Sequence, residues 1–418
     1  MPLDDLKVRI DRELRTRRFL DYFQSSQWAL EKSPLVEELQ RESASQPSAE
    51  LVVLIERAVR HVVDVILHAD DSDGLIGDLA AELLELHWQV CTTGVADPKS
   101  LARWMVRFSF DDQDFFTVDP VRYAEALEEA GMTAYRREVQ RRVDAGDEAF
   151  AVRYATERLA VLDGDVDEIV RLVGGELTRP YDFIRIATAM EELGRDDDVL
   201  RWAGRGIVET NGWQVAQLYD LMADVYRRRG DVDQLLPLRR EEHNRMPSAS
   251  SYMHLKEAAE SAGLWGDERD LARDALEVCD RGALVDVLLA EGEVDQAWAV
   301  AGSAGESEIG RRRWQVLADA RMKSDPADAL DVFLNLADQE LTIAGRPSYA
   351  RAIKLLKKAA RSAEAAGRAA VFDEHVRELR EQYRRRPRTL LNKPHSPRSA
   401  TLRLRTAGAR CRETTNSP

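Results

Sequence analysis

Apolar residues recur three or four positions apart over most of the chain, which is the spacing that one face of an α-helix presents. In residues 51–67 the series is Leu51, Leu54, Ile55, Ala58, Val62, Val65 and Ile66. Residues 77–91 repeat the spacing, and stretches at about 348–366 and 369–386 have the length of long amphipathic helices. The hydrophobic pattern therefore predicts an α-helical protein.

Strict alternation of apolar and polar residues, the pattern of a half-buried strand, is almost absent. The one candidate is residues 106–118, VRFSFDDQDFFTV, which form a short and acidic segment. We interpret this segment as a loop anchored by its aromatic residues. Strands are therefore not expected to be a feature of the fold.

Several prolines directly follow a residue with a capping side chain. These pairs are Ser33-Pro34, Asp97-Pro98, Asp119-Pro120 and Asp325-Pro326. Such a pair is typical of a helix start, because the N–H that proline lacks would be unpaired in the first turn. Pro237 fits the same rule with Asp233 as the capping residue, since Pro237 then lies in the first turn.

Glycines recur at similar intervals in the second half of the chain. Each follows one helical stretch and precedes another, at Gly164, Gly194, Gly230, Gly263 or Gly266, and Gly292. The intervals are 30, 36, 33 or 36, and 29 or 26 residues. They scatter around the period of about 34 residues that helix-turn-helix repeats have.

One of these units matches the tetratricopeptide pattern best. Its aromatic, small, turn and terminal positions are Tyr219, Met222, Ala223, Tyr226, Gly230 and Pro247, although Leu235 replaces the usual alanine of the second helix. Other units match in part, at Phe183, Ala187, Ala297, Ala329 and Phe333. Small residues at these places allow two helices to approach closely, and stacking then buries what one pair cannot bury alone.

These patterns predict an all-α fold, a helix-pair repeat (tetratricopeptide-like) α-solenoid with an N-terminal helical region. We assign residues 1–150 to the N-terminal helical region, which shows no clear period. Residues 151–386 form degenerate tetratricopeptide-like helical repeats. Residues 387–418 lack apolar periodicity and hold four of the 14 prolines, so we interpret them as a disordered basic tail.

The net charge of −15 is unevenly distributed along the chain. Residues 384–418 contain ten Lys/Arg and one Glu, a local charge of +9, so the remaining residues sum to −24. A body that acidic repels phosphate backbones, so nucleic acid is expected only through the basic tail. Lysine makes up 9 of the 60 basic residues, a bias typical of a GC-rich bacterial genome.

No apolar run approaches the length of a membrane span, and the N-terminus is charged where a signal peptide is apolar. The cysteines, Cys91, Cys279 and Cys411, are odd in number and far apart, unlike a disulfide framework. We therefore expect a cytoplasmic protein without a membrane partner. The eight tryptophans lie mostly in apolar helical stripes, where core is the expected place for them.

Two acidic stretches resemble calcium loops at first sight. In residues 70–81 the first and last ligand positions would be Ala69 and Ala80, and in residues 162–170 the closing glutamate would be Gly174. Capped turns between helices fit both stretches better.

Other chemistry is equally sparse. No histidine forms a His-Glu-x-x-His motif or pairs with a cysteine at ligand spacing, and neither a nucleophile elbow nor a phosphate-binding loop occurs. The arginine clusters at 136–142, 227–229 and 311–313 have acids beside them, which favours charge pairs on helix surfaces. We expect no metal, no cofactor and no catalytic residue.

Several stretches resemble, in order and spacing, the long helical region of bacterial SWIM-type zinc-finger proteins. They are DSDGLIGDLAAELLELHWQVC, LARWMVRF, VRYAEALEEAGMTAYRRE, LTRPYDFIRIATAMEELGRDDDVLRWAGRGI, LRREEHNRMPSASSYMHLKEAAE, WQVLADARMKSDPADALDVFLNLADQEL and REQYRRRPRTLLN. The likeness spans roughly residues 10–391. In that family a Cys-x-Cys…Cys-x-His segment precedes this region, and neither half of it occurs here. The zinc- and DNA-binding roles that the finger implies therefore do not carry over.

The resulting hypothesis is a non-catalytic protein–protein interaction scaffold. By analogy with tetratricopeptide arrays, a protein or peptide partner would lie in a concave groove. The groove would be lined by residues of the first helix of each pair that are not used in packing between helices. These residues are Thr188, Glu191, Gln217, Asp220, Asp224 and Arg227. The alternative is a nucleic-acid-associated accessory protein, as the finger-bearing relatives imply, supported by the basic tail and the arginine clusters.

Overall fold

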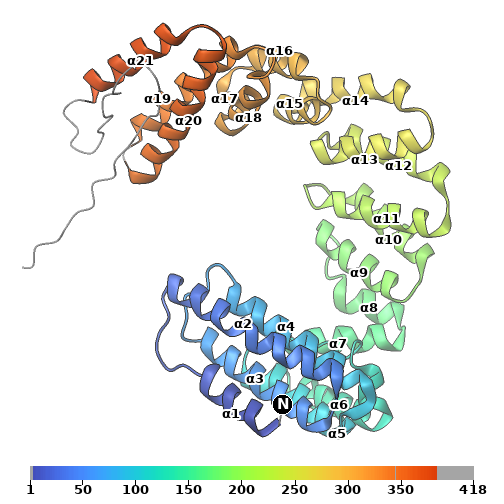
Figure 1. Ribbon diagram of the computed structural model, residues 1–418. Coiled ribbons are helices and arrows are strands. Elements are labelled where there is room, and N and C mark those ends of the chain that lie inside the picture. Colours follow the sequence, from blue (N-terminus) through green and yellow to red (C-terminus); the bar gives the residue numbers. More distant parts are fainter. Residues whose placement is uncertain (1–2, 344, 384–418) are drawn as a thin grey trace, which may run out of the picture. The chain divides into compact units, whose positions relative to one another are not determined.

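The computed structural model describes residues 3–343 and 345–383. Every named element in these residues is a helix (Figure 1). Within those residues a single isolated parallel bridge, between Leu20 and Ala69, is the only β-type pairing. The predicted all-α, helix-pair repeat fold is therefore confirmed. No helix in the described residues combines the length and the apolar character that a membrane span requires. The predicted tail, residues 387–418, lies outside the described residues.

The chain divides into two compact units, residues 1–225 and 226–418. The first contains α1 (Leu3–Glu13), α2 (Tyr22–Ser45), α3 (Ala49–Ile66), α4 (Leu75–Val90), η1 (Cys91–Val95), α5 (Pro98–Arg107), η2 (Phe108–Asp112), α6 (Ala124–Asp144), α7 (Phe150–Asp163), α8 (Val166–Val173), α9 (Pro180–Glu192), α10 (Asp196–Glu209) and most of α11 (Val215–Arg229). The predicted boundaries after residues 150 and 386 stay predictions.

The second unit continues with helix pairs, and its two longest helices, α19 and α20, lie near its end. It contains α12 (Val232–Arg245), α13 (Ala249–Ser261), α14 (Trp265–Cys279), α15 (Arg281–Ala290), α16 (Val294–Ala304), α17 (Glu306–Ile309), α18 (Arg311–Arg321), α19 (Pro326–Thr342), α20 (Arg346–Ala365) and α21 (Ala369–Gln382). One apolar cluster joins α12 to α18, and a second joins α18 to α21. The two long helices predicted near the end of the chain correspond to α20 and α21.

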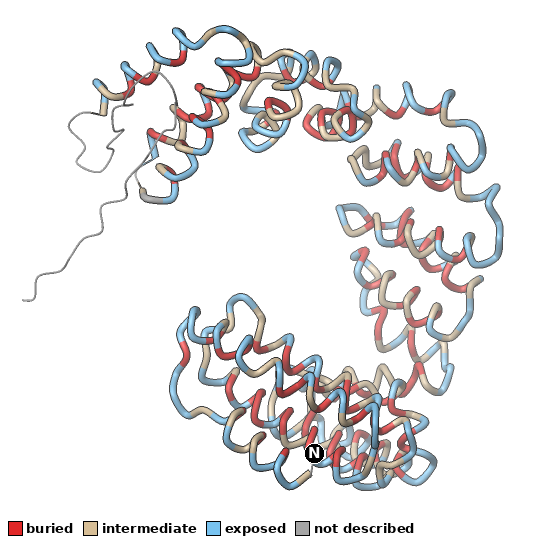
Figure 2. The backbone as a smooth tube through the Cα atoms, in the orientation of Figure 1, coloured by how far each residue is buried: buried red, intermediate tan, exposed pale blue. Residues whose placement is uncertain are grey.

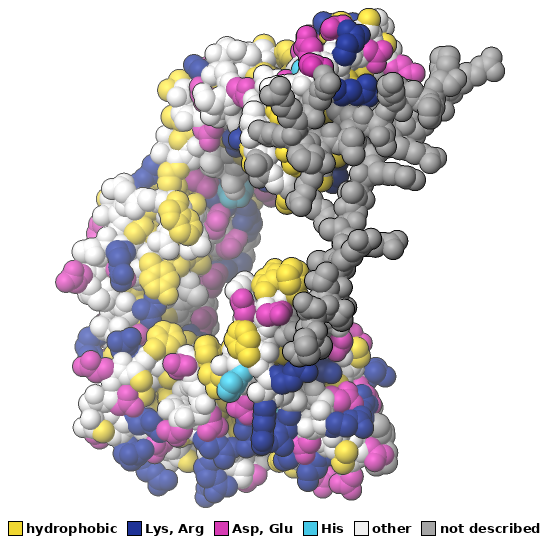
Figure 3. Space-filling model, turned by 90° about the vertical axis from the view of Figure 1, so that its left-hand side faces the viewer, with side chains coloured by type: hydrophobic (Ala, Val, Ile, Leu, Met, Phe, Trp, Pro, Cys, Tyr) yellow, Lys and Arg dark blue, Asp and Glu magenta, His cyan; other side chains and the backbone are white. Residues whose placement is uncertain are grey.

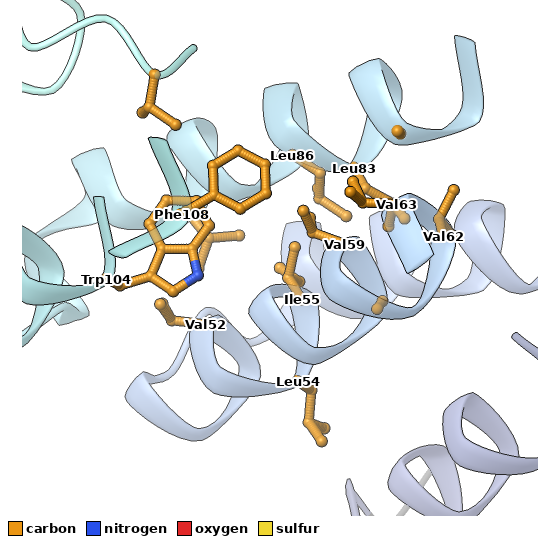
Figure 4. Packing of buried hydrophobic residues seen from close by; sticks show 14 of the residues in the cluster. Val52, Leu54, Ile55, Val59, Val62, Val63, Leu83, Leu86, Trp104 and Phe108 are labelled. Carbon is orange, nitrogen blue, oxygen red and sulfur yellow. The ribbon is translucent and has the colours of Figure 1, made fainter. Parts of the chain in front are cut away.

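Helices α1 to α7 share one apolar core in the first unit. Helix α3 packs against both α1 and α4, and α2 packs against α4. The predicted stripe of α3 is buried, and Figure 4 shows Ile55 and Val59 facing Leu83 and Leu86 of α4. Figure 2 shows such buried positions recurring along the helices, on the sides turned towards a neighbouring helix.

Glycine in the left-handed conformation ends many of the helices. At Gly164, Gly194, Gly230, Gly263 and Gly292 the φ angles are 66°, 66°, 73°, 69° and 81°. At Gly292 the glycine amide donates to the Leu289 carbonyl (3.1 Å) and the next amide donates to the Leu288 carbonyl (2.8 Å), which is a Schellman motif. The predicted turns are confirmed, and Gly263 rather than Gly266 is the turn residue, since Gly266 lies within α14.

Most residues predicted to occupy the packed positions of the repeats lie in the core, whereas Met222 and Tyr226 are only half-buried. Phe183, Ala187, Tyr219, Ala223, Ala297, Ala329 and Phe333 are all fully buried. The small side chains among them leave room for a neighbouring helix, which is the role that the repeat pattern predicts.

Three of the proline pairs lie at or just before helix starts. Asp97 accepts from the Ser100 amide (2.9 Å), and Asp325 accepts from the Ala327 amide (3.2 Å), so both cap a helix as predicted. Asp119 instead accepts from the Val121 amide (2.9 Å) in a turn, and α6 begins only at Ala124. That pair therefore precedes its helix by a turn.

Two other predictions about proline are wrong. Pro34 lies inside α2, which begins after Asp21 and continues because residues on both sides of the proline, including Trp28 and Leu39, are buried. Pro237 lies beyond the first turn of α12, because Asp231 rather than Asp233 stands at the N-cap after the turn at Gly230. Tertiary burial compensates the hydrogen bond that each proline removes.

The segment 106–118 is only partly the loop that we expected. Its first residues complete α5, and residues 108–112 form the π-helical turn η2. The loop that follows is held by Gln113, whose side-chain oxygen accepts from the Phe115 and Phe116 amides, both at 2.7 Å. Its side-chain N–H donates to the Phe108 carbonyl at 2.8 Å. A polar side chain thus satisfies the loop backbone, in addition to the aromatic contacts.

Candidate functional site

Helices α9, α10 and α11 meet at a single glycine. A Cβ added to Gly206 of α10 would lie 2.6 Å from Cβ of Phe183 on α9 and 2.7 Å from Cδ1 of Leu218 on α11. Only a residue without a side chain allows this approach. Gly206 therefore sets how closely the two helices that carry the predicted binding residues pack on α10. The sequence analysis did not identify it.

In helix α9, the residues predicted to bind a partner lie on the side of the helix that is not fully buried. Phe183, Ile186, Ala187 and Met190 are fully buried, whereas Thr188 and Glu191 are half-buried. A separation of three residues places Thr188 and Glu191 on one face of the helix.

Helix α11 divides its residues in the same way. Val215, Leu218, Tyr219, Ala223 and Val225 are fully buried. Gln217 and Asp224 are exposed and Asp220 is half-buried, and their spacing places the three on one face. Arg227 is exposed further along the same helix, within the second unit. That these residues bind a partner stays a prediction.

Large apolar side chains are also exposed on or next to these helices. Tyr181 is 49% exposed, Val208 80% and Trp213 78%. Because α9 and α10 run antiparallel with Phe183 opposite Gly206, Tyr181 and Val208 lie at the same end of the pair, and Trp213 follows soon after α10 ends. Trp213 thus corrects the expectation that tryptophans are core residues. The Asn211-Gly212 turn before it was the available signal, since a turn interrupts an apolar stripe.

Arg158 links α9 to the N-terminal helices through ion pairs. The Arg158 guanidinium on α7 bonds Asp119 before α6 (2.8 Å) and Glu192 at the end of α9 (2.5 Å). Burial opposes the charged form of Arg158, but the hydrogen bonds that it donates to Glu192 and Asp119 outweigh this effect and raise its pKa. The guanidinium therefore stays charged and fixes α9 to the core of the N-terminal helices.

Arginines of the clusters found in the sequence form ion pairs, as predicted at Glu138 with Arg141, but several of the partners are acids of other helices instead of those beside the clusters in sequence. Arg136 bonds Asp163 (2.6 Å), and Arg142 bonds Asp111 (2.7 Å). In the second unit, the Arg313 guanidinium lies 2.9 Å from an Asp286 oxygen. Figure 3 shows basic and acidic side chains interspersed over the first unit. Arginines held in these ion pairs are less available to bind a phosphate backbone.

The two acidic stretches are capped turns, which confirms that prediction. The Asp71 carboxylate accepts from the amides of Ile76 and Gly77 at the start of α4, both at 2.9 Å. The Asp165 carboxylate accepts from the Glu168 amide (3.0 Å) at the start of α8.

One constellation was missed from the sequence. We expected no histidine to pair with a cysteine at ligand spacing, yet His87 and Cys91 are one turn apart and Nε2 is 3.7 Å from Sγ. Nδ1 of His87 lies 2.9 Å from the Tyr123 hydroxyl, and Nε2 lies 3.6 Å from a Glu56 oxygen. The expectation was wrong because helical spacing brings i and i+4 together.

This buried cluster lacks the charge state of a nucleophilic site. Burial raises the pKa of Cys91 to about 12, with a smaller contribution from the Glu56 charge. Burial also lowers the pKa of His87, against the opposing effect of Glu56. At neutral pH the thiol and the imidazole are both uncharged, and a neutral thiol is a poor nucleophile. We interpret the cluster as a polar part of the core.

No family model matches the chain, and no curated protein matches it either. Among solved structures, the chain is similar to one described as a circular tandem repeat protein with novel repeat topology and enhanced subunit contact surfaces. The identity is 14% and the TM-score is 0.20, over 92% of this chain and 89% of that one. At this TM-score the likeness carries no argument about the fold or the function of this chain.

Proposed function

We propose that this protein is a non-catalytic protein–protein interaction scaffold, whose partner binds the surface of α9, α10 and α11. The observation that carries the proposal is the exposure of Trp213 immediately before α11, four residues ahead of Gln217 in the polar stripe of that helix. Exposed tryptophan rimmed by polar side chains is typical of the centre of a protein interface. The polar stripe of Thr188, Glu191, Gln217, Asp220, Asp224 and Arg227 would supply the rim.

The rigidity of the surface supports the same proposal. Gly206 packs α10 tightly against α9 and α11, and Arg158 fixes α9 to the N-terminal helices. A surface held in this way loses little conformational entropy when a partner binds. We further propose that the protein works in the cytoplasm and is related to the helical region of SWIM-type zinc-finger proteins.

The test begins with the partner recovered on the full-length chain, purified and titrated against variants. We expect Trp213→Ala to weaken binding by about 2 kcal/mol, because a central tryptophan contributes most of the contact area. Thr188→Lys combined with Gln217→Lys should weaken binding by about 1 kcal/mol, because two bulky charges enter the polar rim. Calorimetry gives both affinities, and circular dichroism checks that the variants fold.

The matched control is Thr133→Lys combined with Gln140→Lys on α6, where both residues are exposed. It adds the same charge to the same residue types at another helix and should leave binding unchanged. Equal binding by the wild type, Trp213→Ala and both lysine variants would contradict an interface on α9 to α11.

The alternative is a nucleic-acid-associated accessory protein, which would use the arginine clusters of the body as well as the basic segment 384–418. Its charge of +9 favours that role, whereas the pairing of Arg136, Arg142 and Arg313 argues against a groove in the body. A chain that ends at Tyr383 lacks all ten Lys/Arg of that segment, so it should lose DNA binding at low salt if the scaffold proposal holds. Tight, salt-sensitive DNA binding by that shortened chain would favour the alternative.

A further inference from the structure

A groove of about 930 Å³ lies between α2 and α4 in the first unit, away from the surface proposed above. The last turns of α2 form one wall with Gln40, Ser43 and Ala44, and α4 forms the other. The two helices pack against each other beneath it (Figure 1). None of the α9 to α11 residues contributes to it, so what it binds does not depend on the proposed function.

The wall on α4 carries three carboxylates on one helix face. Asp78, Glu82 and Glu85 are spaced four and three residues apart, and no lysine, arginine or histidine lines the groove. Glu85 is occupied, since Arg122 lies 2.8 Å away and Gln89 donates to it at 3.2 Å. Within the described part of the chain, Asp78 and Glu82 have neither an ion pair nor a side-chain hydrogen bond. The groove therefore presents two uncompensated negative charges.

The floor of the groove contains a buried hydroxyl that lacks a partner. Ser43 is only 8% exposed, and among the described residues nothing hydrogen-bonds its Oγ. Leu86 and Val90 are buried beside it, and Ala81 is exposed along the same wall. A buried hydroxyl without a partner is rare in folded proteins and is explained when a ligand completes its hydrogen bond.

The end of α2 adds to the negative character. The last turn of α2 contains no basic residue, so nothing in it offsets the partial negative charge of the helix C-terminus. A cation placed between this end and the carboxylates of α4 would be attracted from both walls. The acids are also spread along the helix, since Asp78 and Glu85 are about 10 Å apart at a rise of about 1.5 Å per residue. A row of cations fits that spread better than a single ion.

We propose that this groove binds a basic, amphipathic peptide segment of a partner protein. Arginine or lysine side chains pair with Asp78 and Glu82, and the apolar side of the segment covers Ala44 and Ala81. Rotation of the Ser43 side chain towards the groove would let its hydroxyl make with the peptide the hydrogen bond that it lacks in the free protein. Charge complementarity selects this occupant, because all the charged side chains of the lining are acidic.

The first test uses the full-length chain and a fluorescent helical peptide with arginine at every third or fourth position and leucine between. Fluorescence anisotropy should detect saturable binding that weakens with added salt. Asp78→Asn combined with Glu82→Gln should reduce the affinity about tenfold, because both ion pairs are lost. The matched control is Glu125→Gln combined with Glu129→Gln, exposed acids of α6, which should bind as the wild type does.

A peptide with glutamate in place of arginine should not bind. Equal affinity in the wild type and the Asp78→Asn, Glu82→Gln variant would overturn the proposal. So would self-association of the chain that this variant abolishes, since the occupant would then be a second copy.

The second test isolates the hydroxyl. Ser43→Ala should lower peptide affinity about two- to fivefold, because one hydrogen bond to the peptide is lost. The same variant should unfold at the same or a higher temperature than the wild type, because a buried unpaired hydroxyl is removed. A lower unfolding temperature with unchanged affinity would show that Ser43 serves the fold, and would overturn its place in the site.

Discussion

The helices of residues 3–163 and the helix pairs that follow them bury their apolar faces in different ways. The N-terminal helices α1 to α7 share one core, in which residues far apart in the sequence meet, such as Leu83 of α4 and Ile55 of α3. The later pairs pack through small residues, such as Gly206 and Ala297, and end in glycine turns. The first arrangement is one large interior, whereas the later helices of the second unit form smaller clusters of consecutive helices, and small residues allow close approach.

Irregular backbone is also concentrated in the N-terminal helices. Two π-helical turns, η1 and η2, follow α4 and α5, and Glu128 interrupts α6 with a φ of 47°. Trp104 stacks on Phe108 across one of these joins, with ring centroids 5.2 Å apart. A single core accommodates such irregularities because many neighbours compensate each one. A repeat made of similar units offers fewer neighbours, and the comparison predicts different responses to mutation.

The largest effect is expected in the shared core. Leu83 is fully buried, so Leu83→Ala should lower the free energy of unfolding by about 2–5 kcal/mol. Because the core is shared, hydrogen exchange should accelerate throughout α1 to α7. Leu30→Ala is the control, since Leu30 is 67% exposed and its loss should change stability by no more than about 0.5 kcal/mol. Acceleration confined to α4 would contradict the single core.

The next largest change in stability is expected at Gly206 of α10, and Gly204 of the same helix is the control. Gly206→Ala should lower the free energy of unfolding by about 1–3 kcal/mol, because the added methyl meets Phe183 and Leu218. Gly204→Ala should raise it by about 0.5–1 kcal/mol, since nothing lies within 4 Å and alanine favours helix. Urea denaturation of both variants gives the difference. The same sign for both would refute the close approach at Gly206.

A smaller effect is expected at the glycine turns. Gly292→Ala should lower the free energy of unfolding by about 1–2 kcal/mol, because its φ of 81° is unfavourable for a residue with a side chain. Gly302→Ala in α16 is the control and should be stabilising, because Gly302 is helical and has open space around it. Thermal unfolding followed by circular dichroism compares them. A neutral Gly292→Ala would mean that the turn relaxes without strain.

The smallest effect is a pH dependence of the N-terminal helices. Hydrogen bonds from Arg57, and then from His61 (2.9 Å), hold the pKa of Asp11 well below its usual range. A lowered pKa contributes stability above the unfolded value of about 4 and loses it as the pH falls towards the folded value. We expect about 1 kcal/mol, because the pair is partly exposed.

Denaturation of the wild type and Asp11→Asn at pH 7 and at about pH 3 measures this contribution. The variant should be less stable at pH 7, and the difference should shrink in acid, where Asp11 begins to be protonated in the unfolded chain. A difference that is independent of pH would assign the effect to packing instead of charge.

The sequence by itself determined the helices, their turns and much of the packing within each pair. The glycines at 164, 194, 230, 263 and 292 end helices because the left-handed conformation is a local property of the residue. Asp97 and Asp325 cap helices through amides two or three residues away. Such signals are readable because the groups involved are close along the chain.

Tertiary structure decided what depends on residues far apart. Burial on both sides carries α2 through Pro34, which reads locally as a helix start. Gly206 resembles any helical glycine until Phe183 and Leu218 pack against it, and Trp213 resembles a core residue until a turn leaves it exposed. Ser43 becomes unusual only because the packing around the end of α2 buries its hydroxyl without offering a hydrogen bond. Local chemistry sets the backbone conformation, whereas the two proposed binding surfaces depend on which helices pack against each other.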